Sequence, residues 1–290
     1  MSALERALPG LHQKVISQTP DPVPPDVLTA CHGKRLIQDV RSSCDQATDT
    51  GRIVSLNPDT AVSPASWEAA LAAVACTRGA VQAVVTGPAT NAFCAVRPPG
   101  HHATPDEAMG FCLFNNVALA ARHALSMPGI DRVLIADWDV HHGNGTQDIF
   151  YHDGSVFFFS MHQHPHYPGT GMASEIGAGD GEGLTLNIPL PPHLPASRYV
   201  SEFLGGMDEA ISRLAPDIIL LSAGFDAAIG DPLGGFTLET DDFAYLTREV
   251  AARAGKACRG RLVSVLEGGY NPPELGRNVA AHVTALAEAA

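Results

Sequence analysis

The sequence lacks three features that would narrow its class at once: a surplus of basic residues, paired cysteine motifs and a long apolar run. Its 18 Lys and Arg residues face 31 Asp and Glu residues, and the formal net charge is -13. This charge disfavours a nucleic-acid backbone as a partner and is compatible with a cationic substrate. The six cysteines show no Cys-x-x-Cys pair, which favours reduced, mostly buried thiols.

The sequence also shows no signal peptide and no membrane span. The N-terminus lacks a basic start followed by an apolar core, and no apolar run approaches the ~18 residues that cross a bilayer. We therefore expect a soluble cytoplasmic protein that binds neither membrane nor nucleic acid, and the sequence leaves a homo-oligomer open. Because no composition break marks a linker, we predict one domain over residues 1–290.

Short apolar runs alternate with helical periodicity along the chain. This alternation predicts an α/β fold with a mostly parallel central sheet and helices on both faces. Expected strands lie at residues 93–96, 133–136, 156–160, 184–187, from 218 and at 262–266. Expected helices span residues 63–85, 117–126, 197–214, from 240 and 273–289, the first capped by Ser63 and the fourth by Thr240.

Ionisable residues follow the apolar run at 133–136 at every second position. Asp137, Asp139 and His141 would share one face of extended backbone, so two carboxylates and an imidazole would converge at a strand end. This is a metal-ligand spacing, although an acidic loop with an incidental His pair is the alternative. His142 should leave the opposite face and stay off the metal.

Other unusual polar groups stand at the ends of further predicted strands, where open α/β sheets bind ligands. They are His101, His102, Asp226 and Tyr270. Asp139, His141 and Asp226 would give a metal three protein ligands and leave a position open, as in catalytic zinc sites. Fe(II) or Mn(II) would suit the same donors. The histidines at 162, 164 and 166 are expected on a solvated rim rather than at a second metal site.

Five segments resemble the successive motifs of the zinc-dependent histone deacetylase family. They are Arg97-Pro-Pro-Gly-His-His-Ala103, Gly110-Phe-Cys-Leu-Phe-Asn-Asn116, Asp137-Trp-Asp-Val-His-His-Gly-Asn-Gly-Thr-Gln147, Ser222-Ala-Gly-Phe-Asp226 and Leu266-Glu-Gly-Gly-Tyr270. Trp138, Asn144 and Thr146-Gln147 look most like the class II branch, which includes bacterial histone deacetylase-like amidohydrolases. The resemblance implies an arginase/deacetylase-like three-layer fold and a hydrolase of N-acetyl amines.

The same resemblance implies a role for each polar group at the strand ends. Zn²⁺, one per chain, would be held by Asp139, His141 and Asp226. His102 would be the general base and then the acid, with Asn144 as its partner, and His101 would pair with Asp137. Tyr270 would donate to the tetrahedral oxyanion.

A substrate channel and a structural K⁺ are implied as well. The channel would be lined by Gly110, Phe111, Tyr167 and Leu233. The main chain would bind the monovalent cation at Asp137, Asp139, His141, Ser160 and Met161. Leu233 stands where polyamine-selective relatives carry a Glu, which favours an acylated lysine peptide or another small acyl-amine substrate over acetylpolyamines.

The chain departs from the family at its start. Relatives usually begin with an additional strand and a His-Pro-Glu-type rim segment, whereas this chain begins at the following helix, so we expect a sheet without that edge strand and a wider pocket mouth. An acetylpolyamine amidohydrolase, an arginase-type ureohydrolase with two metals and a non-catalytic acyl-lysine-binding module remain alternatives. Retention of Tyr270 speaks against the last.

Overall fold

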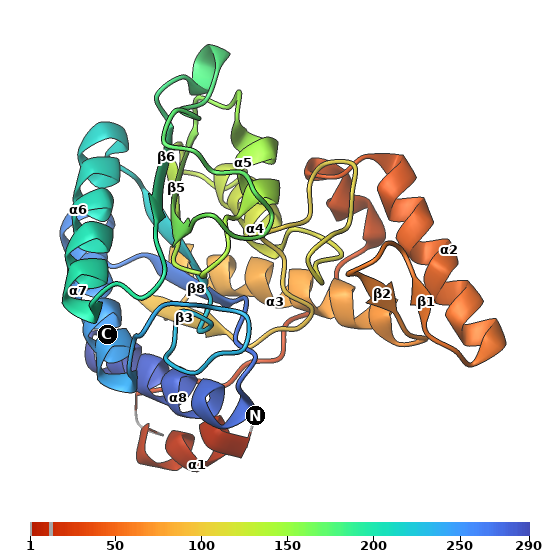
Figure 1. Cartoon of the computed structure of the whole chain (residues 1–290), viewed down its shortest axis with the longest axis horizontal. Coiled ribbons are helices and arrows are strands. Elements are labelled where there is room, and N and C mark those ends of the chain that lie inside the picture. Colours follow the sequence, from red (N-terminus) through yellow and green to blue (C-terminus); the bar gives the residue numbers. More distant parts are fainter. Residues whose placement is uncertain (1, 12–13) are drawn as a thin grey trace.

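A six-stranded sheet, in which every paired strand runs parallel, forms the centre of the computed structural model, which describes residues 2–11 and 14–290. The strand order is β3-β8-β7-β4-β5-β6 (Figure 1). The strands are β3 (Asn91–Cys94), β4 (Val133–Asp137), β5 (Val156–Gln163), β6 (Thr185–Leu190), β7 (Ile218–Ala223) and β8 (Leu262–Leu266). The predicted α/β class with a mostly parallel sheet is confirmed.

Helices cover both faces of this sheet. The helices among the described residues are α1 (Ser2–Leu11), α2 (Lys34–Thr50), α3 (Ser66–Val85), α4 (Asn116–Leu125), α5 (Asn144–Phe150), α6 (Ala196–Leu214), α7 (Thr240–Cys258) and α8 (Pro272–Glu288), with short 3₁₀ helices at η1 (Pro25–Ala30) and η2 (Gly179–Gly181). Val133 and Ile135 of β4 join the core with α3 and α4, while Leu134 and Ala136 join the core with α6, α7 and α8. Because successive side chains of a strand point to opposite faces, β4 contributes to two apolar cores, one on each side of the sheet.

The strand order reverses direction between β4 and β7. After β4 the chain adds β5 and β6 on one side, and it then returns to place β7 and β8 on the other side. β4 and β7 are paired in register, with Asp137 opposite Ser222. Their carboxyl ends therefore form the topological switch point at which open α/β sheets bind ligands.

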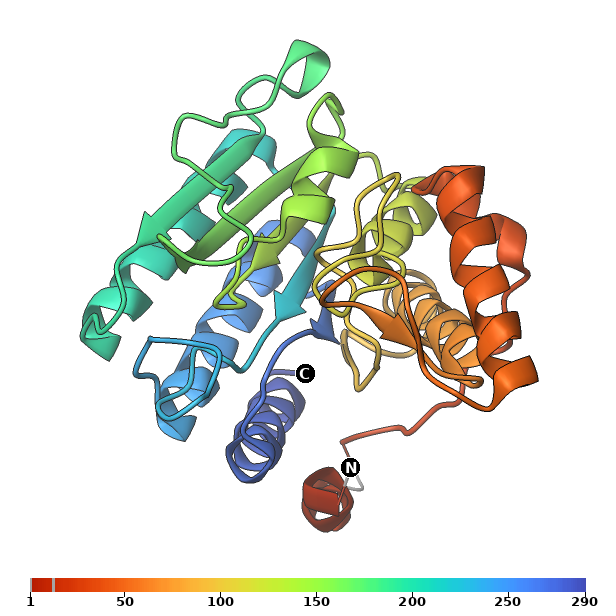
Figure 2. The same cartoon turned by 45° about the vertical axis from the view of Figure 1, so that its right-hand side comes forward.

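A small hairpin lies beside the central sheet and was not predicted. β1 (Val54–Ser55) and β2 (Ala61–Val62) pair antiparallel, and each is only two residues long. Asn57 Oδ1 holds the turn by accepting hydrogen bonds from the N–H groups of Asp59 and Thr60. Figure 2 shows the hairpin (orange) next to the loop before α4 (yellow). Such short strands carry too little alternation to be recognised in a sequence.

Two predicted helix caps are wrong. Helix α3 begins at Ser66 rather than after Ser63, because the Ser66 hydroxyl accepts the N–H of Ser63 at 2.9 Å and residues 64–65 form a turn. Helix α7 is capped by Glu239, whose side chain forms a capping box with Asp242. Thr240 instead donates its hydroxyl hydrogen to Asn278, at 2.6 Å.

Three predicted strands also have other limits, and one of them, β6, runs over Thr185–Leu190 rather than 184–187. β3 lies two residues earlier than expected, because Asn91 to Cys94 pair with β8. β5 continues through Gln163, and this extension makes His162 a buried core residue rather than a rim residue. The His162 ring lies 2.9 Å from the Ser160 hydroxyl and 3.0 Å from the carbonyl oxygen of Gly171.

Helix α3 is the one described helix that is long and apolar enough to cross a membrane by length and composition alone. Trp67, Val74 and Val81 on this helix lie in the core shared with α4 and the sheet. We therefore interpret α3 as a core helix, which is the commoner reason for such a composition.

Candidate metal centre and active site

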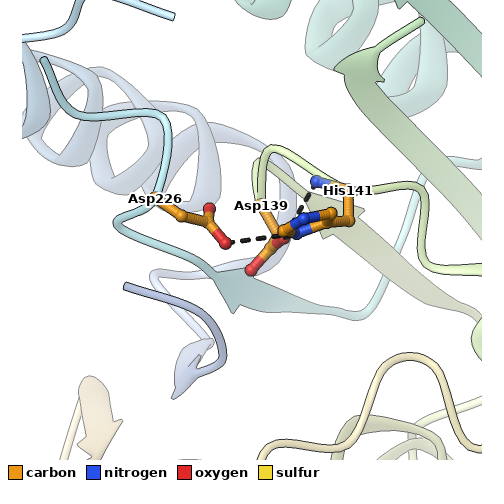
Figure 3. A group of neighbouring side chains, drawn as sticks. All are labelled: Asp139, His141 and Asp226. Atoms are coloured by element: carbon orange, nitrogen blue, oxygen red, sulfur yellow. Dashed lines mark hydrogen bonds and ion pairs between the residues drawn. The ribbon is translucent and has the colours of Figure 1, made fainter. Parts of the chain in front are cut away.

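Two carboxylates and one imidazole meet at the switch point. Asp139, His141 and Asp226 are buried, and one ligand atom from each lies within 4.8 Å of the others. Figure 3 shows the three side chains pointing toward one another from the loops that follow β4 and β7. His141 Nδ1 is 2.9 Å from Asp139 Oδ1 and 3.3 Å from Asp226 Oδ2. The structure thus brings together the three residues that the sequence marked as ligands.

One oxygen of Asp226 is left over in this group. Its Oδ1 accepts the N–H of Val140 at 2.9 Å, whereas Oδ2 is buried and has no hydrogen-bond partner among the described residues. The single Nδ1–H of His141 is directed at the nearer carboxylate, Asp139. A buried carboxylate oxygen that accepts no hydrogen bond costs free energy, which a bound cation would offset.

Two glycines make room for the carboxylates. A Cβ added to Gly268 would lie 2.0 Å from Asp226 Oδ2, and one added to Gly224 would lie 2.1 Å from Asp139 Oδ2. The N–H of Gly268 donates to Asp139 Oδ2 at 2.9 Å. Against the effect of burial, the neighbouring carboxylates raise the pKa of His141 to about 10. The two carboxylates thus favour positive charge between them, and the residues present fit a divalent cation.

Two adjacent histidines of the loop after β3 lie beside this group. His101 Nδ1 is 2.9 Å from Asp137 Oδ2, and His102 Nδ1 is 2.8 Å from Asn144 Oδ1. Although burial opposes it, Asp137 and Asp139 raise the pKa of His101 well above its ordinary value. Burial and the charge of His101 lower the pKa of His102 well below its ordinary value. One imidazole is thus held charged and the other neutral.

The expected partner of His102 also fixes its tautomer. Because Asn144 Oδ1 can only accept, His102 Nδ1 carries the hydrogen and Nε2 keeps a lone pair. The amide nitrogen of Asn144 donates to the His102 carbonyl at 3.5 Å, so the amide orientation follows from two contacts. His102 is therefore a neutral imidazole with one free acceptor atom.

Tyr270 also lies beside this group, in the loop after β8. Its ring meets that of His141 edge-on at 6.5 Å and that of Phe111 at 5.8 Å. Burial and the carboxylates of Asp139 and Asp226 raise the pKa of the Tyr270 phenol, so it keeps its hydrogen at neutral pH.

A cavity of about 520 Å³ connects these groups with the surface, and its lining includes His102, His141 and Tyr270. All four residues that the resemblance placed in a channel also line it: Gly110, Phe111, Tyr167 and Leu233. Phe111, Tyr167 and Leu233 are 43%, 37% and 39% exposed, as expected of residues at an entrance. The metal group therefore borders, through His141, a cavity with partly exposed apolar walls.

Sequence reasoning assigned no role to two carboxylates that shape this site. Glu267 Oε2 accepts the N–H groups of Gly100 and His101, at 2.7 and 3.2 Å, and Oε1 accepts the hydroxyl of Ser222. Asp231 Oδ2 accepts the N–H of Tyr270 at 2.7 Å. Glu267 could have been recognised because it directly follows an apolar strand. Asp231 carries no comparable sequence signal, apart from being an acidic residue close to the third ligand, Asp226.

Two further expectations concern residues around β4. His142 points away from the metal group, since its Nδ1 is 2.7 Å from the Thr170 hydroxyl and its Nε2 is 3.0 Å from Gln147 Oε1. Ser160 pairs in register with Asp137, and Met161 follows it in the buried core. Both residues belong to the main-chain cation site that the resemblance implies, and binding of K⁺ there stays a prediction.

The chain matches the histone deacetylase domain over residues 1–286. It belongs to the histone deacetylase family. The resemblance that the five motifs carried is therefore confirmed, and with it the arginase/deacetylase-like fold. The crystal structure described as "HDA15 HD domain" superposes with a TM-score of 0.90 and 34% identity, covering 99% of this chain and 80% of that one.

Relatives in this family come from plants, archaea and bacteria. Histone deacetylase 14, chloroplastic, from Arabidopsis thaliana is 40% identical over 88% of this chain. A probable deacetylase from Archaeoglobus fulgidus is 44% identical over 73% of it, and a histone deacetylase-like amidohydrolase from Pseudomonas aeruginosa is 42% identical over 75%. The matches cover 62%, 59% and 57% of these relatives' own lengths.

Proposed function

We propose that this chain is a zinc-dependent amidohydrolase that removes acetyl or other acyl groups from the side-chain amine of lysine in peptides or proteins. Family membership supports the reaction class. One observation carries the proposal: Asp139, His141 and Asp226 form a buried group, and His141 of this group lines the same cavity as His102 and Tyr270.

The three ligands suit a catalytic rather than a structural zinc ion. Two carboxylates and one imidazole leave at least one coordination position for substrate or water, whereas structural sites are closed by four protein ligands. When bound, the ion would supply a Lewis acid for the substrate carbonyl and would lower the pKa of water. Asp139, His141 and Asp226 are the residues that would hold it.

His102 is the residue that would move the proton. Its Nε2 accepts a proton from the attacking water and later delivers it to the nitrogen of the leaving amine. The lowered pKa keeps His102 neutral and ready to accept, and the hydrogen bond to Asn144 keeps the lone pair on Nε2. His101 remains paired with Asp137 and acts through its positive charge.

Tyr270 would stabilise the charge that develops on the carbonyl oxygen. Its phenol keeps its hydrogen because burial and two carboxylates raise its pKa, so it can donate to that oxygen. Losing one such donor typically costs ~10²-fold or more in turnover. Retention of this donor speaks against a module that only binds acyl-lysine.

The cavity walls favour a lysine side chain over a polyamine. Phe111, Tyr167 and Leu233 would enclose the alkyl chain of lysine and exclude water from it. Asp59 is the one carboxylate at the mouth among the described lining residues, and both of its oxygens already accept hydrogen bonds. A second ammonium group on the substrate would therefore have to share Asp59 with these donors.

A panel of substrates on metal-quantified protein tests the proposal. Turnover of an acetyl-lysine peptide should exceed that of acetylspermidine, and it should disappear when zinc is removed and return when zinc is added. A strong preference for acetylspermidine would overturn the substrate class. Full activity of metal-free protein would remove zinc from the chemistry, and two transition metals per chain would favour a ureohydrolase.

A further inference from the structure

The turn of the unpredicted hairpin is hydrogen bonded to one wall of the cavity. Asn57 Nδ2 donates to the carbonyl oxygen of Ala108 at 2.5 Å, and Asp59 Oδ1 accepts the N–H of Gly110 at 3.1 Å. The hydroxyl oxygen of Thr60 accepts the N–H of Phe111, also at 3.1 Å. Three successive contacts thus fasten the loop that carries Phe111.

That loop has a backbone conformation that needs support. Gly110 and Phe111 both have positive φ, 55° and 67°. A Cβ on Gly110 would lie 2.3 Å from His102 Cδ2, so only glycine allows this approach to the proposed base. Phe111 has no such freedom, and left-handed backbone costs a bulky residue energy. The contacts with Asp59 and Thr60 offset this cost and hold the Phe111 ring at the entrance.

The same carboxylate reaches the other wall. The phenol of Tyr167 donates to Asp59 Oδ2 at 2.9 Å, although the two residues are 108 positions apart. Tyr167 packs edge-on against His102, with ring centroids 5.1 Å apart. Because Oδ1 of Asp59 holds the Phe111 loop and Oδ2 holds Tyr167, the two walls are joined through one side chain.

We infer that Asp59 is a positioning residue that fixes the width of the channel. The hydrogen bond that it accepts from the Tyr167 hydroxyl, which we call the latch, holds the two walls together. While the latch is closed, Phe111 and Tyr167 keep a fixed separation and admit a slender alkyl chain. When it is broken, the Tyr167 ring can swing away from the Phe111 loop, and substrates with bulkier linkers enter. This inference rests on the proposed function, because it assigns the selectivity of that same site.

A competition assay measures this selectivity directly. Two dipeptides with identical caps, one containing acetyl-lysine and the other 4-(acetamidomethyl)phenylalanine, are hydrolysed in one tube by the zinc-loaded protein. We expect the ratio of their kcat/KM values to favour acetyl-lysine and to fall about tenfold in Tyr167→Phe and in Asp59→Asn, in the range that pocket shape usually commands. The ratio does not depend on how much of a variant is folded.

Matched variants and a second measurement complete the test. Tyr245→Phe, at an exposed tyrosine of α7, should leave the ratio unchanged. An unchanged ratio in both Tyr167→Phe and Asp59→Asn would overturn the inference.

Amide hydrogen exchange tests the latch without any turnover. Exchange at Gly110 and Phe111 should be roughly tenfold faster in Asp59→Ala than in the exposed control Asp49→Ala. If the wild-type protein hydrolysed no acyl amine, the proposed function would fail. Hydrogen exchange would still test the positioning role of Asp59. Faster exchange would support the role of Asp59 in holding the wall, and equal exchange would overturn it.

Discussion

The backbone N–H of Tyr270 donates a hydrogen bond to Oδ2 of Asp231, with nitrogen and oxygen 2.7 Å apart. The other oxygen of Asp231 accepts the N–H of Leu233 at 2.9 Å. One carboxylate in the loop after β7 thus orients the proposed oxyanion donor and one wall of the cavity. Because this contact is to the main chain of Tyr270, it sets where the phenol points rather than its acidity.

Removing Asp231 should therefore misplace Tyr270 without disturbing the metal. We expect Asp231→Ala to lower kcat by about tenfold or more, since small displacements of a catalytic group are costly. Asp231→Asn, which keeps an acceptor oxygen, should recover part of the loss. Zinc content by elemental analysis should stay at the wild-type level in both variants. Wild-type kcat in Asp231→Ala would contradict this role.

Replacing Tyr270 itself tests the donor. Tyr270→Phe should lower kcat by ~10²-fold or more and leave the zinc content unchanged, because the hydroxyl has no part in holding the metal. Steady-state kinetics on zinc-loaded protein measure the loss. Tyr245→Phe is the control, and equal turnover in Tyr270→Phe and the control would exclude an oxyanion role for this phenol.

Asp226→Asn should release the metal. The substitution replaces the anionic carboxylate of Asp226 with a neutral amide, which weakens binding of a divalent cation. Zinc per chain after dialysis should fall well below one, and activity should fall with it. The same substitution at exposed Asp49 provides the control. Full zinc occupancy in Asp226→Asn would mean that the metal lies elsewhere.

Leu233→Glu should shift substrate preference toward polyamines. The new carboxylate would stand at the partly exposed mouth of the cavity, where it can pair with the distal ammonium of acetylspermidine. We expect kcat/KM for acetylspermidine, relative to an acetyl-lysine peptide, to rise about tenfold. Leu233→Gln supplies the shape without the charge, so a similar rise in that variant would argue against the electrostatic reason.

His282 should make the fold sensitive to acid. It lies buried between the hydroxyls of Thr247 and Ser264, at 2.6 and 2.8 Å, and burial lowers its pKa to about 3. In the unfolded chain a histidine titrates near ~6.5. Below that pH His282 is protonated in the unfolded chain but stays neutral in the folded chain. Its full contribution to the free energy of unfolding is therefore present above pH ~6.5 and is lost as pH falls toward 3.

The decline due to His282 amounts to roughly 1.4 kcal/mol per pH unit between these limits. His282→Gln should flatten the dependence of the free energy of unfolding on pH by about that slope, as measured by urea titrations between pH 4 and 7. The exposed His152→Gln variant should keep the wild-type slope. An unchanged slope in His282→Gln would show that other groups set the acid sensitivity.

The residues that could be predicted from sequence are those with a local signal. Asp139 and His141 stand two positions apart after an apolar run, and Asp226 ends a second such run. Adjacent strands of a parallel sheet end at the same edge, so strand ends sufficed to bring these residues together. The histidine pair at 101 and 102 was predictable for the same reason.

The residues that were missed act across long distances in the chain. Asp59 lies in a turn between strands of two residues, and its partner Tyr167 is 108 positions away. Asp231 acts on a backbone amide 39 positions later, where sequence gives no hint of a contact. His162 was misplaced because the pairing of β5 with β6 extends the strand beyond its most apolar part. Tertiary hydrogen bonding, which has no sequence period, decided each of these cases.

Asp139 and Asp226, which lie in the loops after the neighbouring strands β4 and β7, are supplied by widely separated stretches of the chain. A polypeptide still emerging from the ribosome would present the first carboxylate and the imidazole long before the second carboxylate had been synthesised. Two donors hold zinc weakly. Loading with metal should accordingly come late in biogenesis, once β7 has docked beside β4.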